Sequence, residues 1–230
     1  MIQNPGIAGI GCALLDILHP DASIESEAFE RYRSRTPGDG GLVPGQLVFA
    51  SALSEFSEKQ VDEIVAEICG DSPPESNIGG PAIVALILAA QMLKPNGIPV
   101  RFFGVRGTDE IGKTLGRLVR KTPLRFDDYI VRDGTSPSTR VLSDPHADNG
   151  AGERTFINEI GVAAEFGTEE IPDVFFHYHV AFFGGTAVLP KIHANIGIPL
   201  RRAKQNGALT IVATVYGPLA PIKRTTPQST

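Results

Sequence analysis

The sequence predicts an α/β fold, a mainly parallel sheet flanked by helices, with a small β flap. Apolar strand-like runs alternate with helical patterns, which is the rhythm of crossover connections between parallel strands. Glycine and proline, 25 and 18 of 230 residues, indicate many tight turns. Between residues 126 and 158 three strand-like pieces (FDDYIVR, STRVLS and RTFIN) follow one another without a convincing helix, which favours a small antiparallel β element.

The first predicted strand covers residues 7–16, IAGIGCALLD, a short apolar run that ends in a carboxylate. We expect this strand to deliver Asp16 at its C-terminal end, the edge of an open α/β sheet where ligands bind. A short surface helix is expected over 21–35, and LVFA at 47–50 is expected to form a strand.

The next predicted helix has clearer start and stop signals in the sequence. Ser57 with Gln60 three residues later makes a capping box. Apolar residues then recur at helical spacing from Val61 to Ile68, and Gly70 with the Pro73-Pro74 pair is expected to stop the helix.

The segment from Ser76 to Leu93, SNIGGPAIVALILAAQML, is the feature around which the chain is organised. Gly79 and Gly80 form a turn, and Pro81 stands at the first helical position, where its missing N–H is no loss. The thirteen residues 81–93 contain one polar side chain, Gln91, so we expect a helix that is buried on nearly every side. Its N-terminus would present free N–H groups to a ligand.

The remaining elements continue the crossover pattern. The pattern predicts a strand at 100–105, a turn at 107–112, a helix at 114–121, a strand at 179–185, a helical stretch to about 206 and a strand at 208–215. Pro199 lies inside the helical stretch and is expected to break or kink it. The prolines after Val215 predict a loose tail.

Composition limits the functional classes. A net charge of −5 without a long basic run argues against nucleic acid as the main partner. No membrane span is expected, since the longest apolar run has thirteen residues. The start shows no secretory signal, and the two cysteines, Cys12 and Cys69, suit a reducing compartment, so a cytoplasmic location is expected.

Two motifs partly match known binding sites, one for a dinucleotide and one for a metal ion, but neither is interpreted as such a site. Gly6, Gly9 and Gly11 lack the preceding strand and following helix of a dinucleotide fingerprint. His177 and His179 have the spacing of two metal ligands on a strand, but no third ligand motif accompanies them, so no metal site is expected.

Taken together, the segments resemble the PfkB, or ribokinase-like, family of carbohydrate and nucleoside kinases. The segments that carry the resemblance occur in the family's order over about residues 7–217: GIGCALLDIL, SNIGGPAIVALILAAQML, FFGVRGTDEIGKTL, STRVLS with GERTFINEIGVAAEF, and HVAFFGG with LTIVATVYG. The resemblance implies a ribokinase-like domain over 1–217 with lid strands near 47–50 and 139–158, and it leaves 218–230 as a disordered tail.

The resemblance also implies ATP with Mg²⁺ as phosphoryl donor and a hydroxyl of a sugar or nucleoside as acceptor. Asp16 matches the acidic position that holds substrate hydroxyls, and Gly79 with Gly80 matches the di-glycine that lets substrate approach the backbone. Gly107, Asp109 and Gly112 match the family's strand-to-helix turn, for which a structural role is expected.

Two departures limit the resemblance. Val84 stands where many members have an asparagine that bonds the sugar. The family's Gly-Ala-Gly-Asp turn, which supplies the catalytic base and an anion hole, does not occur in this sequence. We therefore expect a truncated or degenerate kinase, incomplete at the C-terminus, with no catalytic residue of its own and little turnover. The ATP-binding region is expected to be mostly absent.

Two alternatives stay open. The chain could serve as a non-enzymatic binding module that self-associates, as a homodimer, through the edges of its lid sheet. It could also be a marginal fragment whose unfinished sheet leaves an edge and helix faces uncovered.

Overall fold

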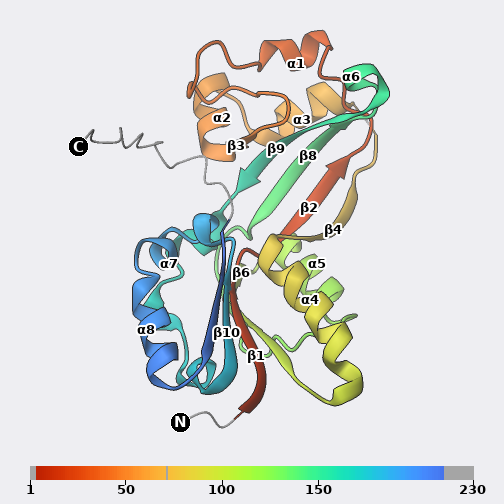
Figure 1. The fold of residues 1–230 in the computed structure, drawn as a ribbon. Helices are drawn as coiled ribbons and strands as arrows, with labels where there is room; N and C mark the ends of the chain where they lie inside the picture. The colour runs from red at the N-terminus through yellow and green to blue at the C-terminus, as the bar shows by residue number, and fades with distance from the viewer. Residues whose placement is uncertain (1–3, 71, 215–230) are drawn as a thin grey trace, which may run out of the picture.

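The computed structural model describes residues 4–70 and 72–214, which form a core sheet with helices on both faces and a second sheet above it (Figure 1). The core sheet has four parallel strands in the order β11-β10-β1-β5. These strands are β1 (Asn4–Gly11), β5 (Val100–Phe103), β10 (Tyr178–Gly184) and β11 (Leu209–Ala213). The predicted α/β fold is thereby confirmed.

Helices cover both faces of the core sheet. On one face lie α4 (Pro81–Leu93) and α5 (Glu110–Val119), and on the other α7 (Pro190–Ala194) and α8 (Gly197–Gln205). Short 3₁₀ helices complete this part, at Lys94–Asn96, Gly161–Glu165, Thr168–Glu170, Asp173–His177 and Thr186–Val188. A separate parallel pair, β6 (Val105–Gly107) and β7 (Ile130–Arg132), flanks the sheet.

One apolar cluster packs on each face of the core sheet, and a third lies between the lid strands and the helices over residues 27–69. Phe103, Phe175 and Phe183 pack edge to face under α7 and α8. On the other face Leu86 of α4 packs on β1 at Gly9, where a Cβ would lie 2.3 Å from its Cδ1. Gly9 therefore lets the helix approach the sheet closely, and this explains one of the three early glycines.

The upper sheet, which we call the lid, has five strands in the order β3-β9-β8-β2-β4. They are β2 (Leu14–His19), β3 (Leu47–Phe49), β4 (Glu75–Gly79), β8 (Ser138–Asp144) and β9 (Glu153–Glu159). Helices α1 (Glu27–Arg31), α2 (Ala50–Ser57) and α3 (Val61–Cys69) cover one face, and α6 (Ala147–Gly150) lies in the β8–β9 connection. The predicted antiparallel pair is β8 with β9.

The expected first strand over 7–16 was wrong in its extent. The chain leaves the core sheet after Gly11 and enters the lid at Leu14, so one apolar run supplies two strands of two sheets. Asp16 therefore lies within β2 of the lid, paired with β4 and β8, and not at the end of a core strand. Continuous apolar patterning could not reveal this change of sheet, because both strands are buried.

Several predicted boundaries also differ. The predicted strand at 100–105 divides into β5 and β6. The predicted strand at 126–132, expected in the small antiparallel element, is β7, which instead pairs in parallel with β6. Ser57 does not cap a helix, because it is the last residue of α2, which the sequence did not predict, and its hydroxyl donates to the carbonyl of Leu53. The next helix, α3, begins at Val61 without a side-chain cap.

Pro199 does not break its helix. It lies in the first turn of α8, where no N–H is needed, and the interruption falls at Asn195–Ile196 instead. The expected loose tail at 218–230, with the end of the predicted 1–217 domain, lies outside the described residues.

Helix α4 was predicted to be buried on nearly every side, and this is wrong. Its side toward the sheet is buried, but Val84, Leu88 and Met92 on the outer side are exposed. Among the described residues, no helix is long and apolar enough to cross a membrane.

Candidate functional site

The candidate site centres on Asp16 and Gly79, from neighbouring strands of the lid. Strand β2 pairs antiparallel with β4, which places Leu14 opposite Gly79 and Asp16 opposite Asn77. The Asp16 side chain leans over Gly79, where a Cβ would lie 2.3 Å from the carboxyl carbon and 2.3 Å from Oδ1. Only glycine fits under this carboxylate, so the two residues depend on each other sterically.

A row of polar side chains continues from Asp16 across the lid. Register pairs Asp16 with Thr139 of β8, and Thr139 with Asn158 of β9. Residues paired in register point to the same face of a sheet. The Thr139 hydroxyl donates to Asn158 Oδ1 at 2.7 Å, and both side chains are buried. With Asn77 at the β4 end, the row offers several hydroxyl-binding groups at successive strands.

A second, apolar row runs beside the polar one on the same face. Leu18 pairs with Val141, which pairs with Phe156, which pairs with Leu47. The opposite face carries Leu142 and Ile157 and packs against α1–α3. One face of the lid is therefore structural, and the other carries a polar row next to an apolar one.

The Asp16 carboxyl group is half-buried. Burial raises the pKa of its carboxyl group above the ordinary value. Burial, and then the charge of Asp16, raise the pKa of the Cys12 thiol to about 12. Cys12 is therefore an inert core thiol, and Asp16 is a half-buried carboxylate, which can accept hydrogen bonds from ligand hydroxyls.

The glycine turn leads directly into α4. Gly80 has φ +99°, and a Cβ there would lie 2.6 Å from the carbonyl oxygen of Cys12. That carbonyl also accepts the N–H of Ile83 at 3.2 Å, so this first-turn donor of α4 is already used within the protein. Val84 follows on the exposed side of the first turn and brings no polar group to the site.

The turn at Gly107–Gly112 is structural. Asp109 caps α5 by accepting the N–H of Gly112 at 2.9 Å, and it also accepts the N–H of Ser136 at 2.9 Å and the Ser136 hydroxyl. Burial opposes ionisation, but the hydrogen bonds from Ser136 and Gly112 outweigh it and hold the pKa of Asp109 below its ordinary value. This carboxylate is fully engaged in joining α5 to the β7–β8 connection.

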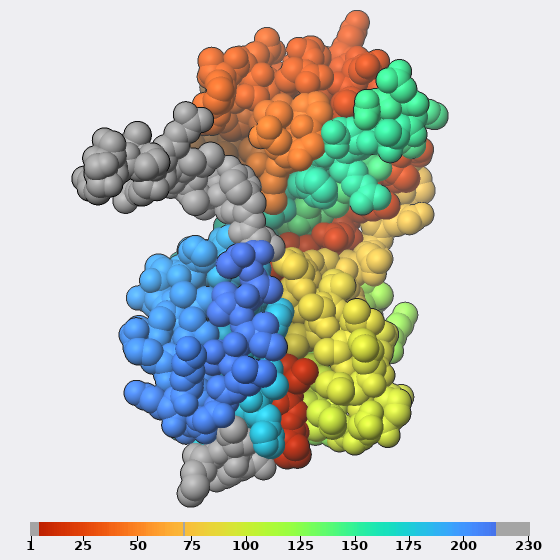
Figure 2. All heavy atoms as spheres, in the orientation of Figure 1, coloured from red at the N-terminus to blue at the C-terminus, as the bar shows by residue number. Residues whose placement is uncertain are grey.

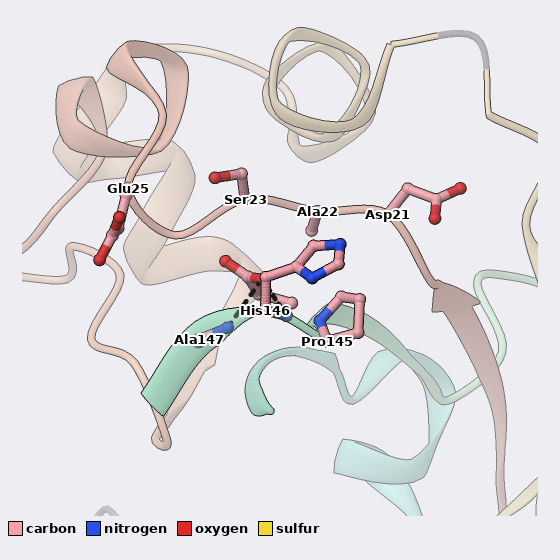
Figure 3. Close-up of a pocket in the computed structure, with 8 residues that line it drawn as sticks. Asp21, Ala22, Ser23, Glu25, Pro145, His146 and Ala147 are labelled. Atoms are coloured by element: carbon pink, nitrogen blue, oxygen red, sulfur yellow. Dashed lines mark hydrogen bonds between the residues drawn. The ribbon is translucent and has the colours of Figure 1, made fainter. Parts of the chain in front are cut away.

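A pocket at the far tip of the lid is a weaker candidate. Figure 3 shows it between the chain after β2 and the β8–α6 turn, with His146 beside Ala22. The Asp144 carboxylate beneath it accepts three backbone N–H groups, those of Ile24, His146 and Ala147. Asp144 therefore serves to shape the loop, and we assign the pocket no function.

The sequence-predicted residues are thus partly assembled. Asp16, Gly79 and Gly80 come together at the β2–β4–α4 junction, whereas Val84 lies on the outer side of α4. Sequence reasoning missed Asn77, Thr139 and Asn158 as members of the site. No local signal marks them, because polar and apolar residues do not alternate along these strands, and only the register shows that they align with Asp16.

No family model and no curated protein matches this sequence. Solved structures do match it. The adenosine kinase of Schistosoma mansoni in complex with adenosine is 14% identical, with a TM-score of 0.66, over 92% of this chain and 55% of that one. The adenosine kinase of Sinorhizobium meliloti is 18% identical, with a TM-score of 0.63, over 90% and 55%.

A probable sugar kinase of Rhizobium etli is 16% identical, with a TM-score of 0.64, over 92% of this chain and 56% of that one. The fold is therefore ribokinase-like, as the sequence resemblance predicted. The chain spans about half the length of these solved structures.

Proposed function

We propose that this chain is the substrate-binding part of a PfkB-type carbohydrate kinase, which binds a sugar or nucleoside through Asp16. The observation that carries the proposal is the seating of the Asp16 carboxylate on Gly79 at one end of a polar row. A carboxylate can accept hydrogen bonds from two hydroxyl groups at once, and Thr139 and Asn158 extend the row to further hydroxyls.

The apolar row beside the polar one favours a ligand that has both a hydroxyl-rich part and an apolar part. Leu18, Val141 and Phe156 lie on the same face as Asp16, one register step further from Gly79. A pentose whose hydroxyls meet the polar row would place a planar base against these side chains. The adenosine kinases of similar fold support the same reading, so nucleosides belong in the ligand panel beside simple sugars.

Phosphoryl transfer by the complete kinase would use ATP and Mg²⁺ with a base that accepts the hydroxyl proton. The described residues include no group of three or more His, Cys, Asp or Glu side chains that could hold a metal ion. The sequence contains no Gly-Ala-Gly-Asp turn. The residues at hand do not fit the phosphoryl donor, so we derive no transfer step and propose that this chain alone is weakly active or inactive.

Calorimetry with ribose, fructose, adenosine and uridine tests the binding proposal. We expect saturable binding of one ligand class, which Asp16→Ala weakens about 10- to 100-fold, the cost of losing charge-assisted hydrogen bonds. The matched control is Asp62→Ala, because Asp62 is an exposed carboxylate on α3, on the other side of the lid. Equal binding by wild type and Asp16→Ala would contradict the proposal.

A coupled ADP assay tests the proposed lack of turnover separately. With ATP, Mg²⁺ and the bound ligand, we expect ADP release no faster than in the protein-free control. Release at ordinary kinase rates, about 1–100 per second, would show that the chain carries its own catalytic groups. Saturable binding without turnover is the expected result, and a non-enzymatic binding module derived from a kinase would give the same result.

A further inference from the structure

The chain contains three Asn-Gly pairs, at residues 96–97, 149–150 and 206–207. A glycine has no side chain to hinder its backbone nitrogen, which can attack the side-chain amide carbon of a preceding asparagine. The new N–Cγ bond closes a succinimide ring, and the side-chain nitrogen leaves as ammonia with the proton of the glycine N–H. Water then opens the ring at either carbonyl and leaves aspartate or isoaspartate. The local backbone decides how fast each pair reacts.

Two of the pairs are held at helix ends. Asn96 ends a 3₁₀ helix, and Asn206 is the C-cap of α8. In each pair the N–H of the glycine donates to the carbonyl of the residue three positions before it, at 3.0 Å from Gly97 and at 2.9 Å from Gly207. Attack by either nitrogen requires this hydrogen bond to break first, so both pairs should react slowly.

The third pair, Asn149–Gly150, lies at the tip of the lid, in the α6 connection between β8 and β9. Figure 2 shows this segment in green at an outer corner of the molecule. Both residues are exposed, and an ideal Cβ at Gly150 would meet no atom within 4 Å. The hydrogen bonds that close the loop come from the N–H groups of Ala151 and Gly152, not from that of Gly150. Among the described residues, none is hydrogen-bonded to the side chain of Asn149.

The backbone at this pair is also weakly held. Asp148 has φ 49° and Asn149 has φ 55°, so two successive residues with side chains are left-handed. That conformation is unfavourable for L-residues, although aspartate and asparagine tolerate it best. It also interrupts α6, so no regular helix opposes a rotation of Asn149. A rotation out of the left-handed region relieves the unfavourable φ and frees the Asn149 side chain to meet the nitrogen of Gly150.

We propose that Asn149 is a modification site, which converts spontaneously to aspartate and isoaspartate, with water as the only co-reactant, ahead of Asn96 and Asn206. The pair at 96–97 is exposed like the pair at 149–150, so exposure does not separate these two sites. The hydrogen bond on the glycine nitrogen does. Conversion adds one negative charge to a chain whose net charge is −5, and the isoaspartate product also lengthens the main chain of the loop by one methylene.

The modification should leave the proposed ligand site intact. Register pairs Asp144 with Glu153 at the tip of the lid, and Thr139 with Asn158 beside Asp16, five residues further along each strand. At about 3.4 Å per residue, the two places are about 17 Å apart. The proposal therefore stands whether or not the chain binds a sugar or nucleoside.

Peptide mapping by mass spectrometry tests the proposal, on the full chain kept for days in mildly alkaline buffer. Trypsin releases residues 141–154, which contain Asn149 and no other amide side chain. Digestion in H₂¹⁸O marks any conversion that occurs during digestion. We expect this peptide to show the mass change of an amide that becomes an acid, and to separate into aspartate and isoaspartate forms. The conversion should be about three- to tenfold faster than at Asn96 and Asn206, the factor that one hydrogen bond of ordinary net strength gives.

Two controls separate the effect of the fold from that of the sequence. In guanidinium chloride the chain is unfolded, and the three pairs should convert at similar rates. Gly150→Ala should slow the conversion of Asn149 alone, because the added methyl hinders the attacking nitrogen, and circular dichroism melting checks that this variant folds. Equal rates at the three pairs of the folded chain overturn the proposal. The same order of rates in guanidinium chloride also overturns it, because neighbouring residues in the sequence would then set the rates.

Discussion

The carboxyl group of Asp16 occupies the space that a side chain at position 79 would fill. The ideal Cβ of residue 79 lies 2.3 Å from the Asp16 carboxyl carbon and 2.5 Å from Oδ2, well inside van der Waals contact. The two residues are 63 positions apart in sequence and are brought together by the antiparallel pairing of β2 with β4. The glycine thus determines where the carboxylate can be, and the pair forms one unit of the site.

Gly79→Ala is expected to damage stability and binding together. The added methyl must displace the Asp16 carboxylate or the β4 backbone, at a cost of about 1–3 kcal/mol in the free energy of unfolding. Urea denaturation measures the loss. In Asp16→Ala the same glycine substitution should cost at least about 1 kcal/mol less, because its obstacle is gone. Additive effects of the two substitutions would show that the pair is not sterically coupled.

Gly116→Ala is the matched glycine substitution and should act in the opposite direction. Gly116 lies inside α5, and the nearest atom to its ideal Cβ is Arg106 Nε at 3.7 Å, an ordinary contact. Replacing a helical glycine by alanine typically raises stability by about 0.5–1 kcal/mol. A loss of stability in the same urea titration would show that α5 packs more tightly at this position than the structure indicates.

Thr139→Val tests how much the polar row contributes to stability and to ligand binding. The substitution keeps the shape of the side chain but leaves Asn158 Oδ1 without its buried donor, which costs about 1–3 kcal/mol. We expect a lower denaturation midpoint and weaker ligand binding by calorimetry. The control is Thr114→Val on the exposed side of α5, outside the lid. Unchanged stability in Thr139→Val would mean that the Thr139–Asn158 hydrogen bond contributes nothing net.

Asp109 should make stability fall in acid. Its folded-state pKa lies below the ordinary value of 3.8, so its contribution is complete above that pH and is lost as pH falls through the folded-state pKa. We expect Asp109→Ala to cost about 1–2 kcal/mol at pH 7, the usual value of a helix cap, and much less at pH 3. Urea titrations at the two pH values measure both.

Asp16 should behave in the opposite way. Its pKa is raised by burial, so the folded protein binds its proton more tightly than the unfolded chain does. Stability is therefore lost as pH rises from the ordinary pKa through the raised one. We expect Asp16→Asn to stabilise the protein at pH 7 more than at pH 3, while it weakens ligand binding. Thermal melts at the two pH values check the sign, and destabilisation at pH 7 would contradict it.

The fold was predictable from the sequence because glycine and proline residues mark the ends of its strands and helices. Gly79-Gly80-Pro81 is the best example, since the backbone freedom of glycine and the fixed φ of proline predict a turn and a helix that starts at Pro81, where α4 begins. The passage of residues 7–16 from one sheet to the other was not predictable. Both strands are apolar, and local pattern does not say which partner strands a buried segment will find.

The candidate site was predictable in part for the same reason. Asp16 and the glycines carry a recognisable local pattern, whereas Thr139 and Asn158 become neighbours of Asp16 only through the register of three strands. The exposed side of α4 was missed because composition predicts burial and does not show whether the covering element is present. The neighbours of Asp16 and the cover on α4 both depend on which distant segments of the chain come together, and local sequence pattern does not show this.

The order of strands in the two sheets also has a consequence during translation. Strand β1, the first to leave the ribosome, pairs with β10, and β2 pairs with β8, so neither sheet can close until more than half of the chain has been made. Such distant pairings slow folding and keep apolar strands exposed in the meantime. The nascent chain should therefore depend on chaperones that shield its first strands, and its yield in cells should fall when those chaperones are scarce.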